Sequence, residues 1–149
     1  MTEMARRALS DDIGFLLSRA SGAVVASVNK ELVAVGLRVR SYSILALACE
    51  RPEGVNQRGA AATLGLDPSQ LVALIDELES RELVVRRLDP ADRRNKLIAA
   101  TDTGRELFGE AQSRASEAHA RHFDGIPEEM VHQMREALYK IAFADVATQ

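Results

Sequence analysis

A short basic run, Arg93-Arg94-Asn95-Lys96, carries the chemistry that stands out most in this sequence. It follows Asp89-Pro90-Ala91-Asp92, where proline fixes one backbone angle and the aspartate side chains can bond their own backbone, as they do in turns. β-forming residues flank the two segments at 83–88 and 97–98, so the stretch predicts a β-hairpin with guanidinium groups at its tip. Such a tip could bind phosphates or enter a narrow groove, or it could simply keep the hairpin solvated.

Asp92 and Arg94 lie two residues apart across the expected tip, where a carboxylate can hold a guanidinium in a fixed fork. The segment from 86 to 96 has five basic and two acidic residues, a net charge of +3, whereas the whole chain carries −3. The basic residues are Arg86, Arg87, Arg93, Arg94 and Lys96. This local concentration of charge favours a nucleic-acid contact over a solvated loop.

Two short helices are predicted directly before the hairpin. The first, residues 56–64, is rich in alanine and ends at Gly65, and the second begins at Asp67, a strong N-cap, with Pro68 in its first turn. Gln70 stands at the capping-box spacing from Asp67. One face of the second helix is apolar: Leu71, Leu74, Ile75 and Leu78. Two helices joined by so short a turn predict a helix-turn-helix, and the hairpin makes it winged.

The N-terminal end of the second helix is the part expected to read DNA. The helix has no Lys or Arg before Arg81, and its three acidic residues repel phosphates: Asp76, Glu77 and Glu79. Free backbone N–H groups at its start favour a phosphate. Ser69 and Gln70 are the first side chains able to reach base edges, and Val72 or Ala73 can touch a thymine methyl. Helix capping is the alternative role for Ser69 and Gln70.

Further basic residues lie at or near the starts of short helices. Arg38 and Arg40 precede or begin a helix expected at 41–50, and Arg58 begins the alanine-rich helix. Each is a candidate phosphate contact, with ordinary surface charge as the alternative.

Composition sets limits on the class of protein. With 149 residues, 46% of them hydrophobic and 28% charged, the chain is expected to form one domain, and a pI of about 5.7 argues against a polycation that coats nucleic acid. Cys49 is the only cysteine and its helical neighbours are apolar, so a reducing compartment and an unreactive thiol are favoured over a redox sensor. No signal peptide or membrane span is indicated, which predicts a cytoplasmic protein with no membrane partner.

Long helices are predicted at residues 10–35 and 101–147. Their apolar stripes have little within one subunit to pack against, which favours a two-fold homodimer. A ligand pocket for a small aromatic or lipophilic effector would lie between these helices and the winged lobe. Its candidate lining residues, for which apolar core is the alternative, are Phe15, Arg19, Tyr42, Leu45 and Phe108. His119 and His122 have a spacing that can share a metal, but the sequence places no further ligand, so no metal or cofactor is expected.

Enzymatic motifs are missing from the sequence: it has no Ser/His/Asp arrangement, paired-carboxylate site, Walker motif or GxGxxG. We therefore predict a DNA-binding protein and no enzyme. A helical dimer that binds partner proteins and has lost DNA binding is the second hypothesis, and the acidic second helix and the low pI are its support.

Several motifs together resemble the MarR family of bacterial transcriptional regulators. They are Asp76 and Leu78-Glu79 in the second helix, Asp89-Pro90-x-Asp92-Arg93-Arg94 in the hairpin, and Thr101-x-x-Gly104 at the start of the next helix. The resemblance implies a dimer that binds pseudo-palindromic operator DNA, usually as a repressor, and is often released by phenolic or lipophilic ligands or, in a subset, by cysteine oxidation. It also assigns Arg94 to the minor groove, oriented by Asp92.

The expected architecture is therefore mainly α with one β-hairpin, in a single domain over 1–149. A winged helix-turn-helix lobe at 41–100 is flanked by dimerisation helices at 10–35 and 101–147. The chain departs from the family pattern at Glu82, where glycine is usual, and the Cβ of glutamate disfavours a left-handed helix end. Val72 and Ala73 also replace residues that are often Thr and Arg.

Overall fold

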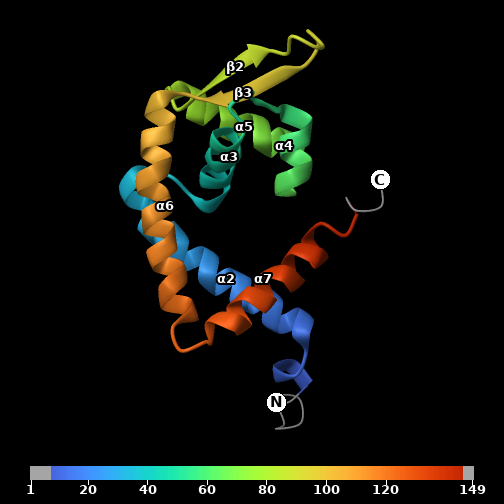
Figure 1. The fold of residues 1–149 in the computed structure, drawn as a ribbon, viewed down its shortest axis with the longest axis vertical. Coiled ribbons are helices and arrows are strands. Elements are labelled where there is room, and N and C mark those ends of the chain that lie inside the picture. Colours follow the sequence, from blue (N-terminus) through green and yellow to red (C-terminus); the bar gives the residue numbers. More distant parts are fainter. Residues whose placement is uncertain (1–7, 146–149) are drawn as a thin grey trace.

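The computed structural model describes residues 8–145, so positions 146 and 147 of the predicted last helix lie outside it. Its elements, in chain order, are α2 (Ile13–Leu32), the 3-10 turn η1 (Val33–Val35), α3 (Val39–Glu50), β1 (Val55–Asn56), α4 (Gln57–Leu64), α5 (Pro68–Ser80), β2 (Val84–Leu88), β3 (Lys96–Ala100), α6 (Asp102–Phe123) and α7 (Glu128–Ala142). Helices α3, α4 and α5 gather with the sheet at one end of the molecule, while α2 and α7 lie at the other and α6 joins the two (Figure 1).

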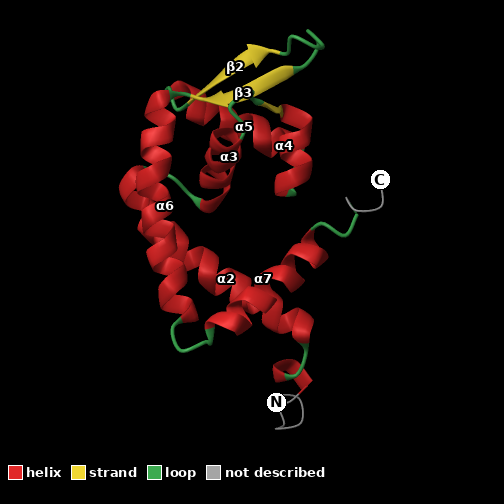
Figure 2. Ribbon diagram, viewed as in Figure 1, coloured by secondary structure: helices red, strands yellow, loops and turns green. Residues whose placement is uncertain are grey.

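The expected mainly α fold with a winged helix-turn-helix is confirmed (Figure 2), but the wing belongs to a sheet of three strands rather than to a lone hairpin. The strand order is β1-β3-β2, and Val55 pairs with Ile98 across β1 and β3. Sequence patterns missed β1 because two residues are too short to show an alternation. Asn56 also caps α4, since its Oδ1 accepts the Arg58 N–H at 2.8 Å.

The core lies between the sheet, α3 and α5. The predicted apolar face of α5 is confirmed, because Leu71, Ile75 and Leu78 are fully buried and Leu74 packs against the cluster. This burial fixes the side of α5 that faces the protein, and it leaves Val72 and Ala73 exposed on the opposite side.

The long helices are buried only in part. Helix α2 is capped by Asp12, whose side chain accepts the Phe15 N–H, and η1 ends at Gly36 in the left-handed conformation. Val28 is buried against the core, whereas Ile13 at the other end of the stripe is 82% exposed. Every residue of α7 is at least partly exposed. Within the described range, no single helix is long and apolar enough to cross a membrane.

Glu82 adopts the left-handed conformation that its side chain disfavours. Its φ is 59°, and it is the one non-glycine residue among 8–145 with a positive φ. Two contacts hold it there: the Leu83 N–H donates to the Leu78 carbonyl at 3.0 Å, and the Thr101 hydroxyl donates to the Glu82 carbonyl at 2.6 Å. The left-handed helix end that the glutamate Cβ disfavours therefore forms all the same.

Replacing Glu82 by glycine should raise the free energy of unfolding by about 0.5–1 kcal/mol, because relief of the left-handed strain outweighs the added freedom of the unfolded chain. Urea denaturation measures the effect. Gly65→Ala is the matched control: Gly65 has a φ of 63° and open space around its Cβ position, so alanine there should destabilise by about 1 kcal/mol. If Glu82→Gly were less stable than wild type, the claim that Glu82 is strained would be wrong.

Candidate nucleic-acid interface

The tip of the wing has the predicted turn chemistry. The carboxylate of Asp89 accepts the Ala91 N–H at 2.9 Å, and that of Asp92 accepts the Arg94 N–H at 3.1 Å. The Asp89 N–H donates to the Asn95 carbonyl at 3.1 Å and closes the loop. These bonds order the loop without help from the rest of the protein.

Asp92 and Arg94 form the predicted fork. Arg94 Nε lies 3.1 Å from Asp92 Oδ1, and Nη2 lies 3.2 Å from Oδ2. The Arg94 side chain is 90% exposed, and the fork occupies only two of the five N–H donors of a guanidinium. Arg94 therefore stands oriented in solvent with donors free for a ligand.

Hydrogen bonds from Arg94, first from its side chain and then from its backbone, hold the pKa of Asp92 below the ordinary value of 3.8. A lowered folded-state pKa means that the fork is intact above the ordinary aspartate range and is lost only as the pH falls through the lower value. The orientation of Arg94 is thus independent of pH near neutrality.

The other predicted wing residues flank this fork. Arg93 and Lys96 are exposed, while Asn95 is half-buried and its N–H donates to the Asp92 carbonyl at 3.0 Å. The wing tip thus presents three basic side chains, Arg93, Arg94 and Lys96, and its two acidic residues, Asp89 and Asp92, already accept hydrogen bonds within the tip.

At the start of α5 the structure separates the two candidate reading residues. Asp67 accepts both the backbone N–H and the hydroxyl of Ser69, and the hydroxyl is the main reason why the pKa of Asp67 is lowered. Gln70 is exposed, and within residues 8–145 its amide makes no hydrogen bond, so the predicted capping box does not form. Ser69 is engaged in capping, whereas Gln70 is available to a ligand.

A shallow groove of about 550 Å³ runs between α4 and α5. It is lined by Gln57, Arg58, Ala61, Ala62, Gly65, Leu66, Pro68 and Leu71. Arg58, a predicted phosphate contact, therefore lies beside the start of α5. Arg40 is exposed in the first turn of α3 and is not part of this lining.

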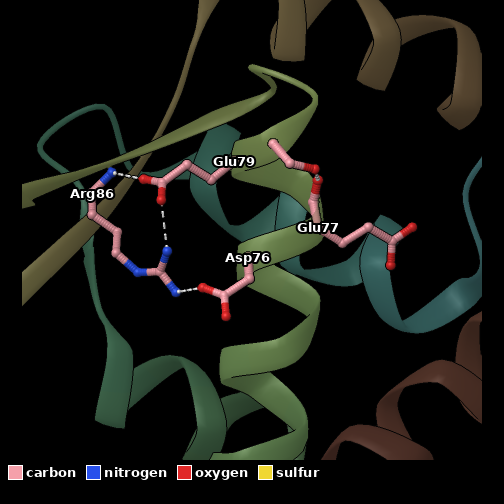
Figure 3. A network of polar contacts seen from close by, with 5 residues as sticks. Asp76, Glu77, Glu79 and Arg86 are labelled. Atoms are coloured by element: carbon pink, nitrogen blue, oxygen red, sulfur yellow. Dashed lines mark hydrogen bonds and ion pairs between the residues drawn. The ribbon is translucent and has the colours of Figure 1, made fainter.

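Arg86 is not a free wing cation. Its Nη2 lies 2.6 Å from Asp76 Oδ1 and its Nη1 lies 2.8 Å from Glu79 Oε1, while its backbone N–H donates to Glu79 Oε2 at 3.1 Å (Figure 3). Its side chain is only 15% exposed. The interpretation of Arg86 as a DNA contact is corrected, because β2 passes along the last turns of α5 and brings Arg86 onto their acidic side.

This cluster also changes the electrostatics expected for α5. Two of its three acidic residues, Asp76 and Glu79, share the single positive charge of Arg86, and only Glu77 points away from the cluster (Figure 3). The helix therefore repels phosphates less than its sequence indicates. Asp76 and Glu79 at a spacing of three, followed by an arginine on the next strand, are the sequence signal that could have revealed this.

Replacing Arg86 by methionine should lower the free energy of unfolding by about 1–3 kcal/mol, because charged hydrogen bonds are lost and Glu79 no longer anchors β2. Arg87→Met is the matched control. Arg87 is exposed and, among residues 8–145, bonds only the Pro52 carbonyl, at 3.4 Å, so its loss should change stability by no more than about 0.5 kcal/mol. Equal urea midpoints for the two variants would show that the cluster contributes nothing.

The predicted pocket residues do not share one environment. Tyr42 and Phe108 stack between α3 and α6 with ring centroids 5.6 Å apart, and burial raises the pKa of Tyr42. Leu45 is fully buried and belongs to the core of this chain, whereas Phe15 and Arg19 are exposed on α2. The Tyr42–Phe108 pair is the part that retains the character of an aromatic binding surface.

Cys49 is half-buried. Burial raises the pKa of its thiol, and the positive charge of Arg105 only partly opposes this. The thiol form therefore predominates at neutral pH, which suits the unreactive cysteine expected from the sequence.

Large apolar side chains are exposed on α2 and α7, at the end of the molecule opposite the sheet (Figure 1). They include Ile13, Phe15, Leu16, Leu17, Met130, Leu138, Tyr139 and Ile141. An apolar surface of this extent is unusual for a monomer and typical of a subunit interface.

Comparison with known proteins gives concordant results. A MarR family model matches residues 35–95. A transcriptional regulator of the MarR family from Rhodococcus sp. RHA1 is 66% identical in a solved structure, with a TM-score of 0.88, covering 91% of this chain and 96% of that one. CouR from Rhodococcus jostii RHA1, solved with p-coumaroyl-CoA bound, is 64% identical, with a TM-score of 0.85 and coverages of 91% and 94%.

A third solved structure, a transcriptional repressor also called CouR and bound to a 23-mer DNA duplex, is 32% identical, with a TM-score of 0.82 and coverages of 90% and 94%. Curated relatives match over a shorter length. The chain spans 63% of a regulatory protein for the hcr operon of Thauera aromatica, at 26% identity over 70% of this chain.

Proposed function

This chain belongs to the MarR family, and we propose that it is a sequence-specific DNA-binding regulator of transcription that works in the cytoplasm as a repressor released by a small-molecule effector. The observation that carries the proposal is the exposed Arg94, held by Asp92 at the tip of the wing. A relative that is 32% identical is described as a repressor bound to duplex DNA, which supports the same role here.

In this proposal the protein contacts both the major and the minor groove of its operator DNA. The start of α5 enters the major groove, where its exposed side chains meet base edges. The wing places Arg94 in the adjacent minor groove, where a narrow A·T-rich stretch attracts arginine electrostatically. Arg93, Lys96, Arg58 and Arg40 then contact the phosphate backbone, with Asn95 and Ser69 beside them.

Gln70→Ala should narrow the preference between operator variants by about 1–3 kcal/mol at a single base-pair position, because an amide that bonds adenine discriminates at that position alone. Competition binding with singly substituted duplexes measures the change. If the variant instead loses affinity evenly for all sequences, Gln70 only positions the helix. Val72→Ala, at the other edge of the exposed side of α5, should affect only a neighbouring thymine.

A second copy of the chain is the partner proposed for the apolar surface on α2 and α7. Two-fold pairing would bury Ile13 and the stripe of α7, which stay exposed in one chain. A dimer presents two recognition helices one turn of DNA apart, so its operator is pseudo-palindromic.

The proposed effector is the CoA thioester of an aromatic acid. CouR from Rhodococcus jostii RHA1, 64% identical to this chain, is described as bound to p-coumaroyl-CoA. The stacked pair of Tyr42 and Phe108 supplies an apolar, aromatic surface between α3 and α6 that suits a phenolic ring.

A mobility-shift assay tests the function. We expect the protein to shift a duplex from upstream of its own gene at about 150 mM salt, and p-coumaroyl-CoA to release it where free CoA does not. No shift of that duplex, and no enrichment of any sequence from a random pool, would favour the alternative of a protein-interaction module. That alternative has lost part of its support, because Arg86 pairs with two of the three acidic residues of α5 and offsets part of their charge.

A further inference from the structure

We propose that Arg81 is a positioning residue, which fixes the angle of α5 relative to the end of α2 and so sets the half-site spacing that a dimer accepts. The inference rests on the proposed function. It concerns a residue that touches neither the core of α5 nor its reading end.

Arg81 joins two elements that are far apart in sequence. It is the C-cap of α5, and its N–H donates to the Glu77 carbonyl at 3.3 Å. Its guanidinium reaches across to two successive carbonyls at the end of η1: Nη1 to Gly36 at 2.7 Å and Nη2 to Val35 at 3.1 Å. A guanidinium presents two parallel donors in a rigid fork, so this contact fixes direction as well as distance.

Gly36 is shaped for the contact. It has a φ of 68°, and a Cβ added there would lie 3.1–3.3 Å from the guanidinium atoms of Arg81. Glycine therefore provides both the left-handed turn that ends η1 and the room that the fork needs.

The turn after Arg81 is held from its other side by α6. The Thr101 hydroxyl donates to the Glu82 carbonyl at 2.6 Å, and the Thr101 N–H donates to the Leu83 carbonyl at 3.1 Å. Helices α2 and α6 pack on one another, and α2 carries part of the surface proposed for the dimer. The end of α5 is therefore bonded to the turn that follows α2 and to the residue that caps α6.

The length of α5 amplifies small changes at this anchor. Its 13 residues span about 20 Å at about 1.5 Å per residue. A tilt of about 10° at Arg81 would move Gln70 by about 3 Å, which is close to one base-pair step. The bonds from Arg81 to Val35 and Gly36 fix the orientation of α5, whereas the core contacts of Leu71, Ile75 and Leu78 keep the helix folded without them.

The experiment measures dissociation constants for three operators. In one the spacer between the two half-sites is unchanged, and in the others it is one base pair longer or one base pair shorter. Each added pair rotates a half-site by about 35°, and we expect wild type to prefer its own spacing by about tenfold or more. Arg81→Lys keeps the charge but loses the fork, and Arg81→Met loses both. Both should reduce the preference to about threefold or less while binding the best duplex nearly as well.

Arg121→Met is the matched control. Arg121 also links two helices, because its guanidinium lies 2.9 Å from Glu31, but it does not touch α5. The Arg121→Met protein should therefore keep the spacing preference of wild type, while its melting temperature falls by about as much as that of Arg81→Met. An unchanged preference in Arg81→Lys would overturn the inference. The inference would also be overturned if Arg81→Met lost the same affinity for operators of every spacing and Arg81→Lys regained it. Arg81 would then be a phosphate contact. A wild-type protein that binds no duplex would overturn both this inference and the proposed function.

Discussion

Replacing Arg94 by alanine should weaken operator binding about 100-fold or more at ~150 mM salt, with the oligomeric state and melting temperature unchanged. Each dimer presents two copies of Arg94, and one well-placed base contact is worth about 1–3 kcal/mol, so the losses combine. Stability is spared because the side chain is 90% exposed and its only described bonds join it to Asp92, two residues away. Fluorescence anisotropy and a thermal melt give the two readouts.

Substitutions that keep part of the fork separate charge from orientation. Arg94→Lys keeps the charge but cannot form the two parallel bonds to Asp92, so it should recover only a small part of the affinity. Asp92→Asn leaves Arg94 charged but less firmly oriented, and an intermediate loss is expected. Lys96→Ala should remove one simple phosphate contact per subunit and reduce the salt slope of the dimer by about two. If Arg94→Ala retained wild-type affinity at that salt concentration, the role given to the wing would be wrong.

Gly104→Ala should be the most destabilising alanine substitution in the chain at a glycine, lowering the free energy of unfolding by about 3–5 kcal/mol. An added Cβ would lie 2.0 Å from the Leu83 carbonyl oxygen and 3.0 Å from its carbon, and both are backbone atoms. Helix α6 would have to move away from the turn that ends α5. The bonds from Thr101 to Glu82 and Leu83 would then be lost as well.

Gly109→Ala is the matched control on the same helix. Nothing lies within 4 Å of its Cβ position, so alanine should raise the free energy of unfolding by about 0.5–1 kcal/mol through helix propensity alone. Urea denaturation of the two variants gives the comparison. Similar midpoints for Gly104→Ala and Gly109→Ala would show that the close approach to Leu83 does not constrain the fold.

Local sequence signals were sufficient for much of the winged lobe. The i, i+3, i+4 pattern of α5 predicted its buried face, and the turn chemistry between Asp89 and Asp92 predicted the wing tip. The fork between Asp92 and Arg94 followed from a separation of two residues. In each case the partners lie close together in the chain, so pattern and geometry are directly related.

Contacts that form only when separate elements fold against one another did not follow from these local patterns. Arg86 meets Asp76 and Glu79 only because β2 folds back along α5, and Arg81 reaches residues 45 and 46 positions away. The two residues of β1 become a strand only by pairing with β3. Glu82 shows the same limit for backbone conformation, because its strain is sustained by Thr101, nineteen positions further on.

Hydroxyl-radical footprinting of the complex with its operator directly tests whether a symmetric dimer contacts both grooves of the DNA. We predict two protected segments related by two-fold symmetry, one helical turn apart, each combining major-groove contacts from the start of α5 with a minor-groove contact from Arg94 on its outer side. With the Arg94→Ala protein, the outer minor-groove protections should be lost at protein concentrations that still give the major-groove protections. A single unsymmetrical protected segment, or protection without any minor-groove component, would contradict the account.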